Sequence, residues 1–506
     1  MGMRGRGRIV ALCVAATVGS AASAVPARAD GVSVPGCAPS AHQGGEWRAY
    51  GNDLLNTRSQ PAEKTITPQN VGSLVMGRRF TAPQAQPGAG GFHNTPVIAD
   101  GCMYLATNTG WVFALNADTG DLLWRTHLAG NAASLIGGVI TGSVSVGNGL
   151  VYVGVSKTNE PYLAALDQQS GRLRWKVVVD ETPNSLLVSS PVLYDDSDGP
   201  LVFQGFMGSE GTATPRGGYT IHDAVTGEIV AKDYTIADED YAAGYRGASI
   251  WSTAAVDPDT NYIYVGTGNP ASKKIEHRHA NALLMIDGDR DRGTFGRIVN
   301  AFKGNPDQYF PGLHRQPVCD EFGDRIAVVW SQACLQLDLD FGASPNIFTD
   351  HLGRKLVGAL QKSGVYYALF ADNMQLAWST VVGGPGVPLN SSSTAVAGGR
   401  VFVPAQPPSQ LWALQVGDGR YDWVQPIADV VHYQSVSEAN GVVYTVDLFG
   451  NLLGFDAVTG LPVLRRPVSL DVGSFKTDGG NSSGIAIARN ALYVVVSDSV
   501  LVYKLP

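Results

Sequence analysis

Two aspartates in the segment ACLQLDLDFGASP (residues 333–345) alternate with apolar residues, as in a half-buried β-strand. This period of two places Gln336, Asp338 and Asp340 on one face and the apolar side chains on the other. Two carboxylates on one face repel each other unless a cation or a proton lies between them. The pair could therefore bind a metal ion, or one of the two could act as a general base. The alternative is a solvated polar face near a turn.

A second segment, RGASIWSTAAVDPDTNYIYVGTGNP (246–270), places a large aromatic residue among small ones. We expect Trp251 in an inner strand, where its flat indole could form a stacking floor for a planar ligand. Asn269 lies between Gly268 and Pro270 at the end of a strand, and an exposed amide carbonyl there is an oxygen ligand suited to calcium. The alternative is that Trp251 only packs and that Asn269 only forms a turn.

Three further features are weaker on their own. Glu210 lies in a Gly-rich loop between two expected strands, where a glutamate is usually just exposed. His277 and His279 are two residues apart without a nearby third ligand, so we expect a surface pair and no metal site. Residues 287–293 (DGDRDRG) resemble the start of a calcium loop but lack its later ligands, and we expect a hairpin turn there.

The elements that must position these residues come from a repeated phrase. It has an apolar run ending in Ala-Leu/Phe-Asp or similar, a polar turn closing on Gly, and then an aromatic or apolar residue. The clearest copies are VFALNADTGDLLW (112–124), YLAALDQQSGRLRW (162–175), YTIHDAVTGEIV (219–230) and LLGFDAVTGLPV (452–463). Such a unit cannot bury its apolar face alone, so tandem copies must pack on one another.

Each unit contains about four strand signals separated by turns, which is typical of a propeller blade. The sequence therefore predicts an all-β fold, an eight-bladed β-propeller of four-stranded antiparallel blades, over residues 73–506. Seven blades remain an alternative on pattern alone. The last unit lacks an outer strand, and we expect residues 73–80 to supply it and close the ring. Residues 30–72 are expected to form an irregular N-terminal arm.

Composition and charge limit the possible functions. The chain is 44% hydrophobic and 16% charged, with 61 Gly and 28 Pro, which is typical of a globular, turn-rich protein. Its net charge is −8 and it has no basic clusters, which argues against nucleic acid or anionic membrane partners. Residues 1–29 have a positive start, a short apolar stretch and a small-residue cleavage site, as in a secretory signal peptide. We therefore expect a secreted or periplasmic protein without a membrane span.

The cysteines fit an oxidising compartment. Four of the five lie outside the expected signal peptide, namely Cys37, Cys102, Cys319 and Cys334. Four cysteines allow three sets of pairs. We favour Cys37–Cys102, which ties the arm to the first blade, and Cys319–Cys334, which closes a local loop, with free buried thiols as the alternative.

In order along the chain, these segments resemble the PQQ-dependent (quinoprotein) alcohol dehydrogenase family. The similar motifs are W-x-x-Y-G-x-D-x-x-N-T-R (47–58), I-T-x-x-N-V (66–71), the repeat, the G-T-G-N-P block (266–270) with its upstream Trp, and the D-x-D segment. The resemblance covers nearly the whole chain after the expected signal. It implies a PQQ cofactor with Ca²⁺ or a lanthanide, an alcohol substrate and catalysis by hydride transfer.

The resemblance also assigns roles to single residues. Trp251 corresponds to the tryptophan beneath the quinone, Asp338 to the catalytic base, and Lys362 to the basic residue at the quinone oxygens. The metal ligands implied are Glu210, Asn269 and Asp338, with Asp340 at the position of a second aspartate associated with lanthanide use. Ser249 and Asn94 correspond to lesser cofactor contacts.

Some features depart from the family pattern. The adjacent Cys-Cys pair that covers the quinone in many members is missing, and Met207 lies where a cofactor-binding serine is frequent. No attached cytochrome domain is present, so a separate electron acceptor such as a cytochrome is implied. Polyvinyl alcohol dehydrogenase-like members share the D-x-D-F-G segment, so the alcohol could be small or polymeric. The alternatives are a non-catalytic propeller that serves as a binding or assembly scaffold, and a degenerate quinoprotein without cofactor affinity.

Overall fold

The computed structural model describes Gly2 and residues 33–130, 138–208, 216–271, 276–306, 339–384, 390–427, 434–472 and 484–506. The chain divides into two compact units, Met1–Gly31 and Val32–Pro506. All of the described helices and strands belong to the second unit. Expected site residues Glu210 and Asp338, and the cysteines Cys319 and Cys334, lie outside the described residues.

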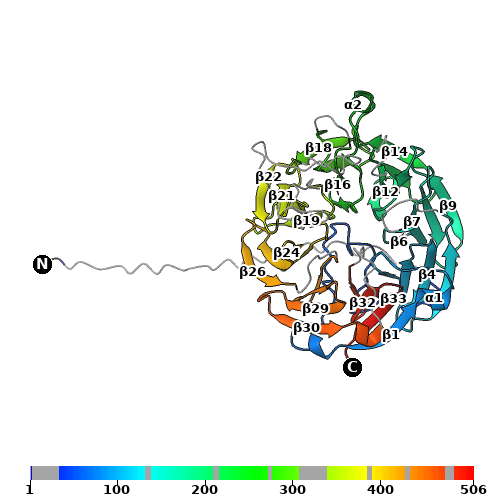
Figure 1. The fold of residues 1–506 in the computed structure, drawn as a ribbon, viewed down its shortest axis with the longest axis vertical. Coiled ribbons are helices and arrows are strands. Elements are labelled where there is room, and N and C mark those ends of the chain that lie inside the picture. The colour runs from blue at the N-terminus through cyan, green and yellow to red at the C-terminus, as the bar shows by residue number, and fades with distance from the viewer. Residues whose placement is uncertain are drawn as a thin grey trace, which may run out of the picture. The chain divides into compact units, whose positions relative to one another are not determined.

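The described strands of this unit form eight antiparallel sheets, which follow one another as the blades of a propeller (Figure 1). The first four blades contain β2 (Val97–Ala99), β3 (Cys102–Ala106), β4 (Trp111–Asn116) and β5 (Leu122–His127); β6 (Ser145–Gly147), β7 (Leu150–Val155), β8 (Tyr162–Asp167) and β9 (Leu173–Val178); β10 (Ser185–Leu186), β11 (Val192–Asp196), β12 (Gly199–Gly208), β13 (Gly218–Asp223) and β14 (Ile229–Tyr234); and β15 (Ala255–Val256), β16 (Tyr262–Gly266), β17 (Ala282–Asp287) and β18 (Ile298–Lys303).

The last four blades follow the same order from the inner to the outer strand. They contain β19 (Asn346–Thr349), β20 (Lys355–Leu360), β21 (Val365–Phe370) and β22 (Leu376–Val381); β23 (Ala395–Ala397), β24 (Arg400–Ala405), β25 (Gln410–Gln415) and β26 (Tyr421–Pro426); β27 (Ser437–Ala439), β28 (Val442–Val446), β29 (Asn451–Asp456) and β30 (Pro462–Pro467); and β31 (Ala486–Ala488), β32 (Ala491–Val496), β33 (Ser499–Lys504) and β1 (Val75–Thr81). The short helices are η1 (Val71–Ser73), α1 (Ala82–Ala85), α2 (Asp238–Ala242) and α3 (Ser469–Val472).

The ring closes as the sequence predicts. Strand β1 pairs antiparallel with β33, from Val75 opposite Lys504 to Thr81 opposite Ser499, and so completes the eighth blade. The inner strands β2 and β31 contact each other, which joins the first blade to the last. The prediction of eight four-stranded blades is confirmed, with one addition. In the third blade β12 is ten residues long, and its end pairs with the extra two-residue strand β10.

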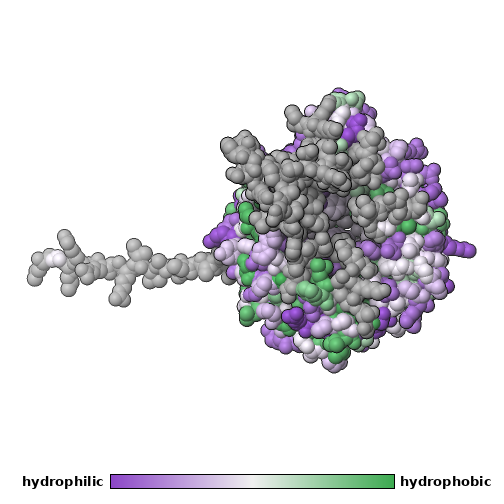
Figure 2. All heavy atoms as spheres, viewed as in Figure 1, coloured by the Kyte–Doolittle hydropathy of each residue, from purple (hydrophilic) through white to green (hydrophobic). Residues whose placement is uncertain are grey.

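Packing between blades explains the composition of the strands. The middle strands are buried along their length because a neighbouring blade covers each face, so their sequences are continuous apolar runs. Outer strands instead alternate, as in β5, where Trp124 is buried and Arg125 is exposed. Hydrophilic residues are accordingly frequent along the rim of the face seen in Figure 2.

The aromatic residue that ends the repeat packs on the next blade. The indole of Trp124 donates a hydrogen bond to the carbonyl of Gln168 (3.1 Å), and Trp378 donates to Val416 (3.0 Å). Beneath Trp124 lies Gly171, with a φ of +68°, where an added Cβ would come within 2.5 Å of the indole. The glycine that closes the repeat turn is therefore required by its left-handed backbone and by the ring above it.

The N-terminal arm crosses the ends of the inner strands. Trp47 exchanges two backbone hydrogen bonds with Ile98 in β2. Further along the arm, the carbonyls of Leu54, Leu55, Thr57 and Arg58 accept from one inner strand each, in the fourth to seventh blades. A disulfide joins Cys37 in the arm to Cys102 in β3, which is the pairing we favoured. The W-x-x-Y-G-x-D-x-x-N-T-R motif thus spans several blades at one end of the ring.

Hydroxyl side chains link the starts of the inner strands. Thr95, Ser143, Ser190, Thr253, Ser344, Ser393 and Ser435 each lie two residues before an inner strand, and Gly484 takes this place in the eighth blade. Backbone N–H groups at these positions donate to the hydroxyl oxygen of the next blade: Ser143 to Ser190 (2.9 Å), Ser190 to Thr253 (3.1 Å), Thr253 to Ser344 (3.0 Å), Ser344 to Ser393 (3.0 Å), Ser393 to Ser435 (3.1 Å) and Gly484 to Thr95 (2.9 Å). We call this set the hydroxyl ring.

None of the helices among the described residues is long and apolar enough to cross a membrane.

Removing one hydroxyl from this ring should destabilise the fold. Thr253→Val leaves the N–H of Ser190 buried without its acceptor, which costs about 1–3 kcal/mol. The shift in the thermal or urea unfolding midpoint measures this cost. Thr253→Ser keeps the oxygen and should unfold close to the unchanged protein; equal losses in both variants would show that the hydroxyl acceptor is not the cause.

Candidate functional site

Three of the expected site residues meet in one buried cluster. The ammonium Nζ of Lys362 lies 2.7 Å from Oδ1 of Asp340, and the indole Nε1 of Trp251 donates to Oδ2 of Asp340 at 3.1 Å. The same ammonium lies 4.9 Å from the centre of the Trp251 ring, within the range of a cation–π interaction. Asp340 is 1% exposed and Lys362 is 6% exposed. The indole, the carboxylate and the ammonium therefore form one connected unit.

The fourth and fifth blades place these residues. Trp251 lies four residues before β15, in a segment without strand structure, so the prediction that it lies within an inner strand is wrong. Asp340 precedes β19, and Lys362 follows the end of β20 by two residues. The backbone N–H of Lys362 donates to the carbonyl of Asp340 at 3.0 Å. Both the side chains and the backbones of the ion pair are thus connected.

Removing either partner of this buried ion pair should lower the free energy of unfolding, because the other charge would stay buried without a counter-charge. A carboxylate and an ammonium lose most of their hydration on burial, and only close contact and further hydrogen bonds offset that loss. Here the indole N–H satisfies the second carboxylate oxygen. A scaffold protein gains little stability from such a pair, since an apolar replacement of similar volume is often as stable.

Asn269 follows Gly268, which lies against the carboxylate of this cluster. Its backbone carbonyl accepts from Ala248 (2.9 Å), and the neighbouring Gly268 donates to the carbonyl of Ser249 (2.7 Å). A Cβ added at Gly268 would lie 3.5 Å from Oδ2 of Asp340, so the carboxylate lies against this turn. Asn269 is 5% exposed, and neither polar atom of its side chain has a partner among the described residues.

These residues fit a hard metal ion. Oxygen ligands from carboxylates and amides suit Ca²⁺, and a buried amide without a partner is costly unless something binds it. In the described part of the chain no group of three or more His, Cys, Asp or Glu side chains could hold a metal. Two of the four expected ligands, Glu210 and Asp338, lie outside that part, while Asn269 and Asp340 lie within it and close together.

Ser249 and Asn94, which the resemblance predicts to be lesser cofactor contacts, are both buried. Ser249 is two residues from Trp251, and its hydroxyl lies 3.4 Å from the carbonyl of Gly208. Asn94 precedes Thr95 of the hydroxyl ring in the first blade and donates from its amide to the carbonyl of Ala106 at 2.8 Å. Met207, at the position of the missing serine, is buried within β12.

Two residues that support the cluster were not predicted. Asn390 is fully buried, and its amide donates to the carbonyls of Lys362 (3.3 Å) and Gly384 (2.9 Å). An added Cβ at Gly342 would come within 2.4 Å of the Trp251 indole, so only glycine fits beside the ring. Gly342 is the glycine of the D-x-D-F-G segment, and Asn390 lies three residues before Ser393, but neither position alone indicates a contact with Trp251 or Lys362.

The histidine pair is buried, so the prediction of a surface pair is wrong. His277 is 6% exposed and its Nε2 lies 3.0 Å from Oδ2 of Asp240 in α2, while Nδ1 of His279 lies 2.6 Å from the carbonyl of Thr235. Burial lowers the pKa of His279 to about 4 despite the hydrogen bond to Thr235. The pair therefore joins α2 to the segment after Asn269. Residues 287–297 form the expected turn between β17 and β18.

Comparison with known proteins agrees with this architecture. The family model described as the glucose/ethanol/alcohol dehydrogenase β-propeller domain (PQQ) matches residues 47–145. A polyvinylalcohol dehydrogenase of Pseudomonas sp is 25% identical over 494 residues, covering 89% of this chain and 72% of the relative. The quinohemoprotein alcohol dehydrogenase ADH-IIG of Pseudomonas putida is 28% identical over 289 residues, covering 51% of this chain and only 37% of the relative.

A solved structure shows the same fold. The quinohemoprotein alcohol dehydrogenase ADHIIG from Pseudomonas putida HK5 superposes with a TM-score of 0.70 at 18% sequence identity, covering 92% of this chain and 80% of that chain. These matches confirm the resemblance to the PQQ-dependent alcohol dehydrogenases that the motifs indicated.

The coupling between Asp340 and Lys362 can be measured. Lys362→Met leaves a buried carboxylate without its cation and should lower the free energy of unfolding by about 3–5 kcal/mol. Adding Asp340→Asn should recover most of that loss, since the double variant buries no charge. A double-mutant cycle by thermal unfolding gives the interaction energy. Additive effects of the two substitutions would show that the groups do not interact in solution.

Proposed function

We propose that the protein is an exported quinoprotein dehydrogenase that oxidises an alcohol by hydride transfer to PQQ, assisted by a metal ion and an aspartate base. The observation that carries this proposal is the cluster of an indole, a buried carboxylate–ammonium pair and an amide, that of Asn269, whose side chain has no partner within the described part of the chain. The relatives named as alcohol dehydrogenases support the same reaction class.

Each residue has a role that follows from its chemistry. When bound, PQQ would accept a hydride from the alcohol carbon, and a bound metal ion would polarise the quinone. Trp251 offers its indole face as the floor for a planar ring. Lys362 provides a positive charge that stabilises negative charge developing on the cofactor. Asn94 and Ser249 are the proposed polar contacts to its edge.

Metal binding and proton transfer fall to the carboxylates. Glu210, Asn269 and Asp338 are the proposed ligands, with Asp340 added where the ion is a lanthanide. Asp338 also receives the hydroxyl proton of the alcohol as hydride leaves its carbon, so that the alcohol loses two electrons and becomes a carbonyl compound. Asp340 holds Lys362 and Trp251 in place for this step.

The substrate and the partners follow from the same family resemblance. A polymeric alcohol is a candidate substrate beside small alcohols, since a relative that aligns with 89% of this chain is named a polyvinylalcohol dehydrogenase. Electrons would leave to a separate acceptor such as a cytochrome. Residues 1–29 would direct export and be removed, leaving the arm (30–72) and the propeller (73–506) to act outside the cytoplasm.

Reconstitution with cofactor tests the proposal. We expect the purified protein with PQQ and Ca²⁺ or La³⁺ to reduce an artificial dye when an alcohol is added. Asp338→Asn should abolish dye reduction without changing the unfolding midpoint, because the base is lost and the fold is not. Asp291→Asn, an exposed aspartate in the β17–β18 turn, is the matched control. Absence of dye reduction with every metal would favour the scaffold or the degenerate quinoprotein.

The identity of the metal has a separate test. Asp340→Ala removes one negative charge, and a trivalent ion should lose more binding energy than a divalent one. We therefore expect the dissociation constant for La³⁺ to rise by a larger factor than that for Ca²⁺, measured by calorimetry on the cofactor-free protein. A larger loss for Ca²⁺ would contradict a role of Asp340 in lanthanide binding.

A further inference from the structure

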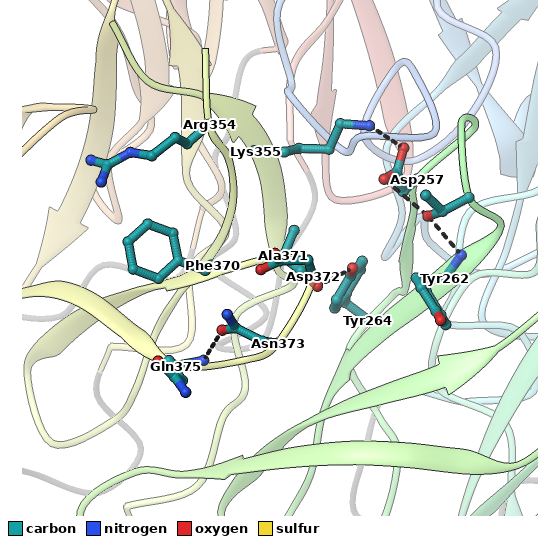
Figure 3. Close-up of a pocket in the computed structure, with 11 residues that line it drawn as sticks. Asp257, Tyr262, Tyr264, Arg354, Lys355, Phe370, Ala371, Asp372, Asn373 and Gln375 are labelled. Atoms are coloured by element: carbon teal, nitrogen blue, oxygen red, sulfur yellow. Dashed lines mark hydrogen bonds and ion pairs between the residues drawn. The ribbon is translucent and has the colours of Figure 1, made fainter. Parts of the chain in front are cut away.

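A cleft of about 710 Å³ lies between the fourth and fifth blades (Figure 3). It is bounded by the β15–β16 turn, the start of β20 and the turn that joins β21 to β22. Its lining residues are Asp257, Thr260, Tyr262, Tyr264, Arg354, Lys355, Phe370, Ala371, Asp372, Asn373 and Gln375. Asp257, Tyr262 and Tyr264 belong to the segment 246–270, but the resemblance gives none of the lining residues a role in the candidate site.

The cleft and the candidate site lie at opposite ends of the same strands. Strand β20 begins at Lys355 in the cleft, and Lys362 follows its other end. Strand β16 begins at Tyr262 in the cleft, and Asn269 follows its other end. Six residues of β-strand span about 20 Å, so a small ligand cannot touch both places. The cleft is therefore a separate place on the molecule.

The two cations of the cleft are already paired. Lys355 pairs with Asp257 (2.6 Å) and with Asp259 at its edge (2.8 Å). Arg354 pairs with Asp350 at 2.7 Å. Asp372 adds a fourth carboxylate, so acidic groups outnumber basic ones in and around the cleft. An anionic ligand would be repelled by this excess of carboxylates, whereas a ligand without charge would leave the ion pairs in place.

The walls combine aromatic faces with polar groups. Tyr262 and Phe370 are half-buried, and the guanidinium of Arg354 lies 5.0 Å from the centre of the Phe370 ring. The hydroxyl of Tyr264 already donates to the carbonyl of Ala371, so this residue contributes mainly its ring. In Figure 3 Phe370 lies on the opposite side of the cleft from Tyr262, with Asp372 between them.

Amide and carboxylate groups line the mouth of the cleft. The side chains of Asp372, Asn373 and Gln375 belong to exposed residues of the β21–β22 turn. The side-chain carbonyl oxygen of Asn373 accepts a hydrogen bond from the backbone N–H of Gln375, and its NH₂ group can donate to a ligand. Together these groups can donate to and accept from hydroxyl groups, while the rings contact C–H groups.

We propose that this cleft binds a segment of a neutral polyhydroxylated chain, such as a polymeric alcohol or an oligosaccharide. Carbons of the chain would pack on Tyr262 and Phe370, and its hydroxyls would bond to the groups at the mouth. The cleft is open to solvent, so the chain can continue beyond it. The polymeric alcohol as occupant rests on the proposed function, whereas binding of a polyhydroxylated chain does not.

Such a site would act by holding the polymer. A chain held at the cleft raises the local concentration of its other segments, including those within reach of the candidate site. The KM for a long polymer should then depend on the cleft, while the KM for a small alcohol should not. The cleft is thus an accessory binding site and takes no part in the reaction.

Affinity electrophoresis tests the proposal without any need for activity. The full-length protein is run through native gels that contain polyvinyl alcohol, dextran, or neither. We expect slower migration in a gel that contains at least one of the two polymers. Comparing the two gels shows whether the cleft binds a polymeric alcohol, an oligosaccharide chain or both. Trp251→Ala, which alters the candidate site, should be retarded equally, so failure of the proposed function would not remove this binding.

Two cleft variants and one control complete the experiment. Phe370→Ala removes one aromatic wall, and Asp372→Ala with Gln375→Ala removes exposed polar groups that cannot disturb the core. Each should reduce the retardation at least fivefold, while Tyr421→Ala, an aromatic residue that is 62% exposed on β26, should not. Unchanged retardation in both cleft variants, equal loss in the control, or absence of retardation in both polymers would overturn the proposal.

Discussion

The hydroxyl ring is the constraint on which the positions of the other residues depend. It joins blade to blade at the start of the inner strands, through N–H groups that would otherwise be buried without acceptors. The candidate site residues are placed by their offsets from it: Asn94 by one residue from Thr95, Trp251 by two from Thr253, Asp340 by four from Ser344, and Asn390 by three from Ser393. A rigid ring therefore brings residues from distant parts of the chain to one end of the axis.

Rigidity matters because the site contains a buried ion pair. Asp340 and Lys362 can stay charged only if their geometry is held, and Trp251 and Asn390 hold it through the carboxylate and the backbone of Lys362. An enzyme likewise stabilises charge that develops during a reaction with charged groups that are already held in fixed positions. The arm also contacts the hydroxyl ring, since the hydroxyl of Tyr50 lies 2.9 Å from that of Ser393 and 3.2 Å from that of Ser435.

Local patterns predicted most of the fold. The repeat turn, its glycine and its aromatic residue are local signals, and they indicated both the blades and the closing strand β1. The resemblance likewise pointed to Trp251, Asn269 and Lys362. The contacts of Asp340 could not be predicted in this way. Its carboxylate pairs with Lys362, which follows β20 in the same blade, and accepts from Trp251 of the fourth blade, and no local pattern links these three residues. The histidines at 277 and 279 looked exposed because nothing local shows that α2 packs against them.

The proposed function requires that the cluster of Trp251, Asp340, Lys362 and Asn269 bind a quinone. Titration of the metal-loaded protein with PQQ, followed by quenching of tryptophan fluorescence, tests it most directly. We predict saturation at one PQQ per chain, and a dissociation constant at least tenfold higher for Trp251→Ala and for Lys362→Met. Unsaturable quenching, or the same dissociation constant in both variants as in the unchanged protein, would contradict the claim.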